Sequence, residues 1–272
     1  MRFKTRYFAY PYLLWMVIFT IAPIALIAYY AFTNADGQLT LGNIVSAMGP
    51  EYMKVLGRSL SLAVLCTLIC LLLAYPAAYI LSKMKNGGVL SLLFMLPMWM
   101  NFLLRTYAWM TLLENTGLIN SLLTAMGLNT VTFLYNSNAV LLGMVYNYLP
   151  FMILPILTTL QKIDRSYIEA AQDLGANPVQ VFLKVILPLS VPGIISGITM
   201  VFMPAVTTFV ISRLLGGGQF MLFGELIERQ FLERFDWHLG SMLSLFVVII
   251  MIISMGIMNK FGADTGEGRP LV

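Results

Sequence analysis

Residues 60–82 read LSLAVLCTLICLLLAYPAAYILS, a stretch without a single charged side chain. A helix rises about 1.5 Å per residue, so a stretch of this length crosses the roughly 30 Å hydrocarbon core of a bilayer. In lipid every backbone amide has to be paired within its own segment, which favours a helix over an open strand. The stretch therefore predicts a transmembrane helix.

The whole sequence shares this apolar character. Of its 272 residues, 59% are hydrophobic and only 10% are charged, and the mean hydropathy is +0.84. Soluble domains are about half apolar and a quarter charged. A soluble core of this chain length does not hide so much apolar surface, so the bilayer has to be the solvent for most of the protein.

Further apolar stretches have the length of a membrane span, and none alternates with the period of two that barrel strands require. The stretch after the basic residues 2–6 is too long for a signal peptide, so we expect a retained first helix. We predict an all-α polytopic membrane protein with one transmembrane domain over residues 1–272. The six predicted spans are residues 12–32, 60–82, 89–113, 139–160, 192–212 and 240–260.

The basic residues outside the spans predict the orientation. Ten of them fall on one side of the predicted bundle and five on the other. Cytoplasmic loops carry the excess of Lys and Arg. We therefore expect a bacterial plasma-membrane protein with both termini in the cytoplasm and a cytoplasmic loop at residues 161–191.

Two other classes of site are disfavoured by the residues present. The net charge of +4 comes from short loops between apolar spans, which is typical of membrane orientation and not of nucleic-acid binding. Cys66 and Cys70 lie one turn apart within an apolar span, as small packing residues do, so we expect no metal site.

The loop at residues 161–191 is predicted to hold two short helices. Ser166 and Glu169 have the spacing of a capping box, which predicts the start of the first helix. Gly175 is typical of the left-handed residue that ends a helix. Asn177 can cap the second helix, which we expect Leu187-Pro188 to break.

The first of these helices carries an apolar stripe made of Tyr167, Ala170, Ala171 and Leu174. A helix of about two turns is marginally stable alone in water, so it requires a surface to pack on. One interpretation is a docking element that inserts into a groove of a partner. The other is a loop that packs under its own bundle, and the residues alone do not separate the two.

A family resemblance favours docking. The segment resembles the cytoplasmic signature of the permeases of binding-protein-dependent ABC importers, which is Glu-Ala-Ala, three residues, Gly, nine residues, Ile, one residue and Leu-Pro. Val185 replaces the Ile as a conservative departure. The matching residues are Glu169, Ala170, Ala171, Gly175, Leu187 and Pro188.

The resemblance extends from the second span to near the end of the chain and is similar to the spermidine/putrescine permease subfamily. Leu96-Pro97-Met98-Trp99, residues 105–109, residues 145–152 and Leu214 to Gly218 carry it. It implies a type I ABC importer bundle, a cytoplasmic ABC ATPase dimer, a second homologous permease and an external polyamine-binding protein. It also implies that the helix around Glu169 transmits ATP-driven motion to the bundle.

The sequence has no Gly-x-x-x-x-Gly-Lys-Ser/Thr loop to cradle nucleotide phosphates. Gly216-Gly217-Gly218 is followed by no Lys and is interpreted as a turn. We therefore expect that this chain is not an enzyme, that it binds no cofactor, and that ATP and Mg²⁺ belong to a partner subunit.

A pathway for flexible cations is expected to combine aromatic faces with carbonyl or carboxylate oxygens. The candidates are Tyr107, Trp109, Glu114, Tyr146, Asn147 and Tyr148. Tyr107 and Trp109 also fit an interfacial aromatic belt. Arg105 is the one charge well inside a predicted span. We favour a structural role for it, because its positive charge would repel a cationic solute in a pathway.

Two rival functions remain to be compared. An intramembrane protease needs a serine and a histidine base within the bundle, but the one histidine, His238, falls in an external loop. A secondary transporter or channel that ATP does not drive usually has Asp, Glu or His in its spans, and these are missing from the predicted spans.

Overall fold

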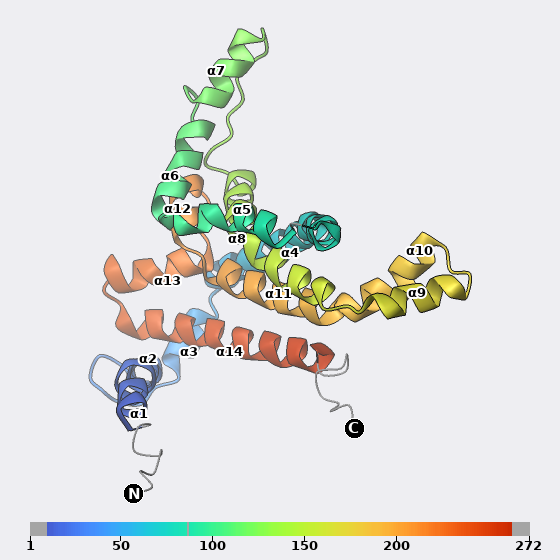
Figure 1. Ribbon diagram of the computed structural model, residues 1–272. Helices are drawn as coiled ribbons and strands as arrows, with labels where there is room; N and C mark the ends of the chain where they lie inside the picture. The colour runs from blue at the N-terminus through green and yellow to red at the C-terminus, as the bar shows by residue number, and fades with distance from the viewer. Residues whose placement is uncertain (1–9, 86, 263–272) are drawn as a thin grey trace, which may run out of the picture. The chain divides into compact units, whose positions relative to one another are not determined.

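The computed structural model describes residues 10–85 and 87–262 (Figure 1). This part of the chain is built from helices, and its single β-bridge joins Thr33 and Leu39. Five helices are long and apolar enough to cross a membrane, and a sixth span results if a bent helix pair is counted as one. The prediction of an all-α membrane protein is confirmed.

The chain divides into two compact units. One unit is made of residues 1–55 and 226–250, and the other of residues 56–225 and 251–272. The second unit contains the loop at residues 161–191 and all six candidate pathway residues.

The first unit begins with a span that is continuous from Tyr10 to Ala31. It comprises α1 (Tyr10–Met16), the π-helical turn η2 (Val17–Ile21) and α2 (Ala22–Ala31). Its most apolar window has no buried residue. After α3 (Gly42–Ala47), the long helix α4 (Pro50–Lys83) leads into the second unit.

The third predicted span is broken where the sequence analysis expected one helix over residues 89–113. Helix α5 (Gly87–Trp99) ends just before Asn101, and the helices from Phe102 onward are turned by 86°. The Asn101 side chain accepts hydrogen bonds from the N–H groups of Leu103 and Leu104, so it caps a new helix. This helix is α6 (Phe102–Leu113), and α7 (Leu118–Ala125) follows it.

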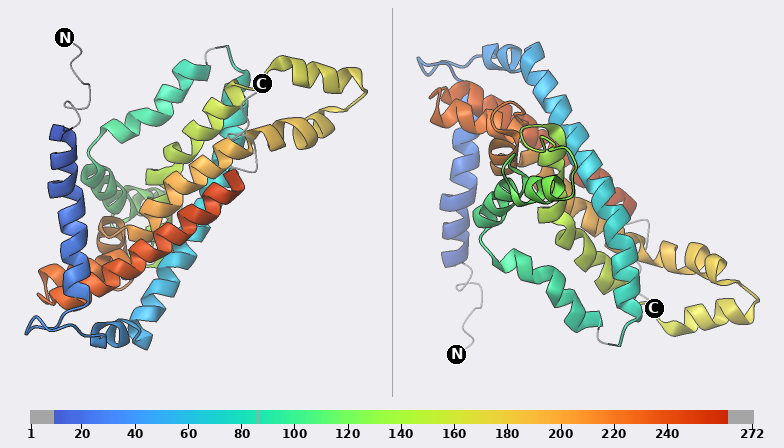
Figure 2. Two further views of the ribbon diagram at one scale, coloured as in Figure 1. Left: turned by 90° about the horizontal axis from the view of Figure 1, so that it is seen from below. Right: turned by 90° about the horizontal axis from the view of Figure 1, so that it is seen from above.

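The second unit is organised around α8 (Ser137–Gln161) and α11 (Leu187–Thr207), which lie side by side (Figures 1 and 2). Two glycines of α11, one turn apart, permit this close approach. A Cβ atom on Gly193 would lie 2.5 Å from Oγ1 of Thr159, and one on Gly197 would lie 2.7 Å from Sδ of Met152. Larger residues at these positions would force the two helices apart.

The predicted break at Leu187-Pro188 is wrong. The chain is helical from Pro178 to Thr207, through α10 (Pro178–Val181), the π-helical turn η3 (Phe182–Ile186) and α11. The N–H of Leu187 donates to the carbonyl oxygen of Phe182, which is the wider spacing of a π-helix. A wider turn gives the Pro188 ring room against the preceding carbonyl groups, so the helix continues.

The fifth predicted span, residues 192–212, is also interrupted. Helix α11 ends at Thr207, and a separate helix, α12 (Val210–Gly216), begins after two non-helical residues. Helix α13 (Phe223–Leu232) follows, and α14 (Trp237–Gly262) is the last span. Although α13 carries several charged residues, its Glu225 side chain is fully buried.

Candidate coupling loop and substrate pathway

Helix α9 (Arg165–Asp173) follows α8 after a short turn. Its N-cap is Asp164, whose carboxylate accepts a hydrogen bond of 2.9 Å from the N–H of Ser166. This N–H and the Ser166 hydroxyl hold the pKa of Asp164 below its usual range. The predicted Ser166–Glu169 capping box is therefore wrong, because Ser166 lies inside the helix and its N–H is used by Asp164.

The other end of α9 forms a Schellman motif. The N–H of Ala176 donates to the carbonyl oxygen of Ala171 at 3.0 Å, and the N–H of Gly175 donates to that of Gln172 at 2.8 Å. Gly175 has φ +82°, a left-handed conformation that other residues adopt at a cost. The expectation that Gly175 ends the helix is confirmed.

The return helix starts with a reciprocal cap. The side chain of Asn177 accepts from the N–H of Gln180, and the Gln180 side chain accepts from the N–H of Asn177. Pro178 occupies the first turn, where its missing N–H costs nothing. Figures 1 and 2 show α9 and α10 as a helical hairpin that projects beyond the ends of α8 and α11.

The α9 helix is not covered by its own bundle. It has no buried residue, and its apolar stripe includes Tyr167 at 58% exposure, while Leu174 at its C-cap is 89% exposed. Glu169 and Ala170 are exposed as well, and Ala171 is partly covered. Of the two interpretations of this loop, packing under the bundle does not agree with this exposure.

Aromatic side chains hold the base of the hairpin to α4. The ring of Phe182 lies edge-on to the rings of Tyr75 and Tyr79, with centroid distances of 5.8 and 5.4 Å. The hydroxyls of Tyr75 and Ser190 are 2.9 Å apart and share a hydrogen bond. These contacts lie within one compact unit and connect the base of the hairpin to α4 and α11.

The candidate pathway residues fall into separate groups. Trp109 on α6 and Tyr146 on α8 meet edge to face, with ring centroids 5.3 Å apart. Both side chains are partly exposed. This is the one pair of candidates that the structure brings into ring contact.

Tyr148 and Asn147 lie elsewhere on α8. Tyr148 is buried, and its hydroxyl donates to the carbonyl oxygen of Pro204 on α11 at 3.2 Å. The amide nitrogen of Asn147 donates to the carbonyl oxygen of Gly143, while its buried Oδ1 has no partner among the described residues. Tyr148 therefore joins α8 to α11, while Asn147 bonds within α8 and keeps an unused acceptor.

Tyr107 lies on α6, and Glu114 is the residue at its C-terminal end. Tyr107 is 46% exposed. Glu114 caps the end of α6 and lines a small cavity of about 190 Å³ with Asn115, Thr116, Thr132 and Tyr135. The lining also includes Leu134 and contains no basic residue.

Arg105 is 8% exposed, and its Nε and Nη1 atoms have no hydrogen-bond partner among the described residues. The guanidinium carbon is 5.9 Å from the ring centroid of Phe102. An unpaired buried guanidinium is costly, so this side chain requires an acceptor from lipid, water or another chain. No group of three His, Cys, Asp or Glu residues capable of holding a metal ion occurs in the described part of the chain.

The sequence analysis missed one buried carboxyl group. The Ser212 hydroxyl donates to Oε2 of Glu225 at 2.8 Å, and the Ser59 hydroxyl accepts from the N–H of Phe223 at 2.7 Å. The start of α13 is thereby fixed to α12 and α4. The nearby turn at Gly216-Gly217-Gly218 was the one sequence signal that the chain reverses here.

The sequence matches the model of the binding-protein-dependent transport system inner membrane component over residues 5–263, so the chain belongs to this family. It is 38% identical over 249 residues to the spermidine/putrescine transport system permease protein PotB of Haemophilus influenzae, with 88% of this chain and 87% of that protein covered. PotB of Escherichia coli is 37% identical over 247 residues, with 87% and 90% covered.

Solved ABC transporters share the fold. A chain from the bacterial alginate ABC transporter, in complex with alginate pentasaccharide-bound periplasmic protein, superposes with a TM-score of 0.81 at 16% identity, covering 96% of this chain and 94% of that one. A chain of the inward-facing MetNI methionine ABC transporter gives 0.58 at 16% identity, covering 81% and 100%. The protein is a multi-pass inner-membrane permease of an ABC importer.

Proposed function

We propose that this chain is the permease subunit of an ATP-driven polyamine importer that moves spermidine or putrescine across the plasma membrane. The substrate class is supported by the names and the extensive similarity of the curated relatives. The ring contact of Trp109 with Tyr146 agrees with a polyamine substrate, because aromatic faces attract cations.

The observation that carries the ATP-driven part is the exposed helix α9, which has a partly apolar surface and no covering from its own bundle. A helix of this kind is stabilised by a groove on a partner protein. The partner is a cytoplasmic ABC ATPase dimer, which binds ATP and Mg²⁺, while this chain binds no cofactor and is not an enzyme. Both termini and the hairpin then face the cytoplasm.

In the assembly, a second homologous permease completes the pathway and an external binding protein delivers the solute. ATP-driven closure of the ATPase pulls on α9, and the contacts of Phe182 with Tyr75 and Tyr79 pass the movement to the spans. The substrate crosses between the two permeases, past Trp109 and Tyr146. Most of the selectivity then rests with the external binding protein.

Uptake of labelled spermidine into proteoliposomes tests the proposal. We expect uptake that requires the ATPase subunit, ATP and the binding protein, with putrescine as a competitor. The alternative, a secondary transporter or channel, predicts uptake by this chain without the ATPase and under an ion gradient alone. That result would overturn the ATP-driven function.

A further inference from the structure

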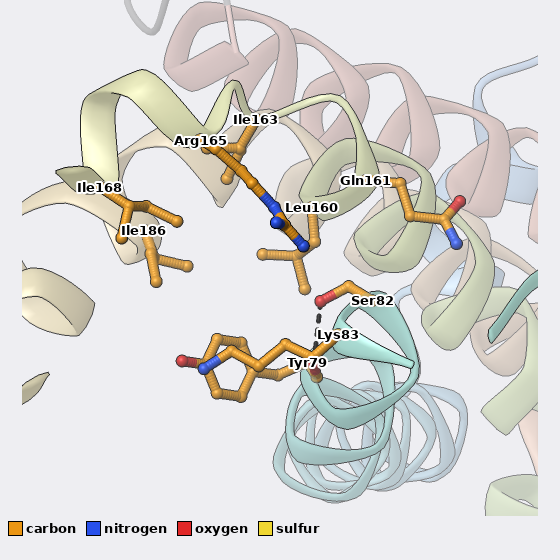
Figure 3. A pocket seen from close by; sticks show the side chains of 9 residues that line it. All are labelled: Tyr79, Ser82, Lys83, Leu160, Gln161, Ile163, Arg165, Ile168 and Ile186. Carbon is orange, nitrogen blue, oxygen red and sulfur yellow. Dashed lines mark hydrogen bonds between the residues drawn. The ribbon is translucent and has the colours of Figure 1, made fainter. Parts of the chain in front are cut away.

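A cavity of about 460 Å³ lies beside the end of α4 and the start of α9 (Figure 3). Lys83 comes from the last turn of α4, Arg165 opens α9, and Ile163, Ile168 and Ile186 supply apolar wall. Figure 3 shows the Arg165 side chain extended from the hairpin toward Ser82 at the end of α4. The volume falls within the range of about 300–1,000 Å³ that is usual for small-molecule sites.

The charge of the cavity is positive and uncompensated. Its lining includes two basic side chains and no carboxylate. The Arg165 side chain makes no hydrogen bond or ion pair with any other described residue. The Nζ atom of Lys83 lies 4.2 Å from the ring centroid of Tyr79. The nearest sequence neighbour with a negative charge, Asp164, does not line the cavity, and its carboxylate is bound to the Ser166 N–H.

The position of the cavity favours an amphiphilic anion. It lies where the candidate membrane spans α4 and α8 end, and the ends of spans are the level at which lipid headgroups are expected. Basic pockets between spans at this level bind anionic headgroups. The isoleucine side chains give the glycerol and the first methylene groups of a lipid an apolar surface, which a free phosphate ion would not use.

We propose that this cavity binds the phosphate headgroup of an anionic phospholipid, with Arg165 and Lys83 as its ligands. The planar guanidinium of Arg165 presents paired N–H groups to two phosphate oxygens, and the Lys83 ammonium adds a third donor. The bound headgroup joins the end of α4 to the first residue of α9. The hairpin is thereby held at a fixed distance from the bilayer.

The test is a lipid titration of the purified full-length protein, together with any partner subunits that co-purify, followed by native mass spectrometry. The probes are phosphatidylglycerol and phosphatidylcholine. We expect phosphatidylglycerol to bind selectively, with its affinity reduced about fivefold by Lys83→Gln or by Arg165→Gln and roughly 25-fold by both. Lys162→Gln is the matched control, because Lys162 is an exposed neighbour that does not line the cavity.

Intact mass in the same spectra verifies that each variant remains assembled, and Lys83→Gln alone suffices if Arg165→Gln does not assemble. Equal lipid affinity in the wild type and the Lys83→Gln variant overturns the proposal. The proposal is also overturned if millimolar inorganic phosphate alone displaces the bound phosphatidylglycerol, because that result would identify a free-phosphate site. The measurement needs no ATP and no polyamine, so failure of the proposed transport function leaves its outcome unaffected.

Discussion

The hydroxyl of Ser212 donates a hydrogen bond of 2.8 Å to Glu225, and both side chains are fully buried. Ser212 belongs to α12, the short helix after the break in the fifth span, and Glu225 belongs to the start of α13. The pair therefore joins the broken end of a span to the segment that folds back on it. Because both groups are buried, removing one partner leaves the other without this hydrogen bond, which costs more than an ordinary exposed hydrogen bond contributes.

Ser212→Ala is expected to lower the free energy of unfolding by about 1 to 3 kcal/mol, because a buried hydrogen bond to Glu225 is lost. The measurement is the thermal unfolding midpoint of the full-length protein in detergent. Ser61→Ala is the control, since Ser61 is exposed and its hydroxyl bonds only to Gly57 of its own helix. Equal midpoints for the two variants would show that the pair does not fix α13.

Local features of the sequence were predictable, and contacts between distant segments were not. Gly175 and Asn177 have roles that depend on the next few residues alone, and the structure has them where the sequence placed them. The N-cap was misassigned because Asp164 and Ser166 are both good capping residues. Asn101 was a usable signal for the break in the third span, since a capping residue followed Pro97 within an apolar run.

The candidate pathway shows the same limit. Trp109 and Tyr146 are far apart in sequence and meet only because α6 turns after Asn101. Tyr146 and Tyr148 are close in sequence but face different neighbours, because successive helical residues are about 100° apart. The apolar composition predicted the helix and the aromatic side chains suggested the candidates. Which of these side chains are in contact depends on the bend at Asn101, which was not predicted.

Replacing Leu174 by Ser is expected to weaken binding of the ATPase subunit about tenfold, because burial of an exposed leucine contributes about 1.5 to 3 kcal/mol. The measurement is the affinity of the purified permease for its ATPase partner. Leu41→Ser is the matched control, because Leu41 is 68% exposed on the other compact unit. If both variants bind the ATPase like the wild type, α9 does not dock through Leu174.

Substitution by Ala and by Asn is expected to have opposite orders of stability at Gly175 and at Gly193. At Gly175 the backbone is left-handed and a Cβ meets no atom within 4 Å, so Asn is tolerated better than Ala, which costs about 1 kcal/mol. At Gly193 a Cβ meets Thr159, so Ala is tolerated better than Asn. Unfolding midpoints of the four variants check the order, and the same ranking at both positions would contradict the two causes.

The cap of α9 is expected to depend on pH. The pKa of Asp164 is lowered in the folded protein, so its stabilisation of α9 is complete above the pKa of the unfolded chain and is lost as pH falls through the lower folded value. Asp164→Asn keeps an acceptor oxygen and removes this dependence, while Asp164→Ala removes the cap at all pH values. Hydrogen exchange of the Ser166 amide measures both effects, and protection in Asp164→Ala equal to wild type would refute the capping role.

Trp109→Ala and Tyr146→Ala are each expected to raise the KM for spermidine uptake about fivefold, because a cation near an aromatic face gains about 1 kcal/mol. Tyr146→Phe keeps the ring and is expected to retain wild-type uptake. Tyr148→Phe is the contrasting variant, since it removes the hydrogen bond to Pro204 and is expected to lower the unfolding midpoint without changing KM. Uptake kinetics in proteoliposomes separate these cases. If the pathway passes Trp109 and Tyr146, removing a ring raises KM, while removing only a hydroxyl leaves KM unchanged.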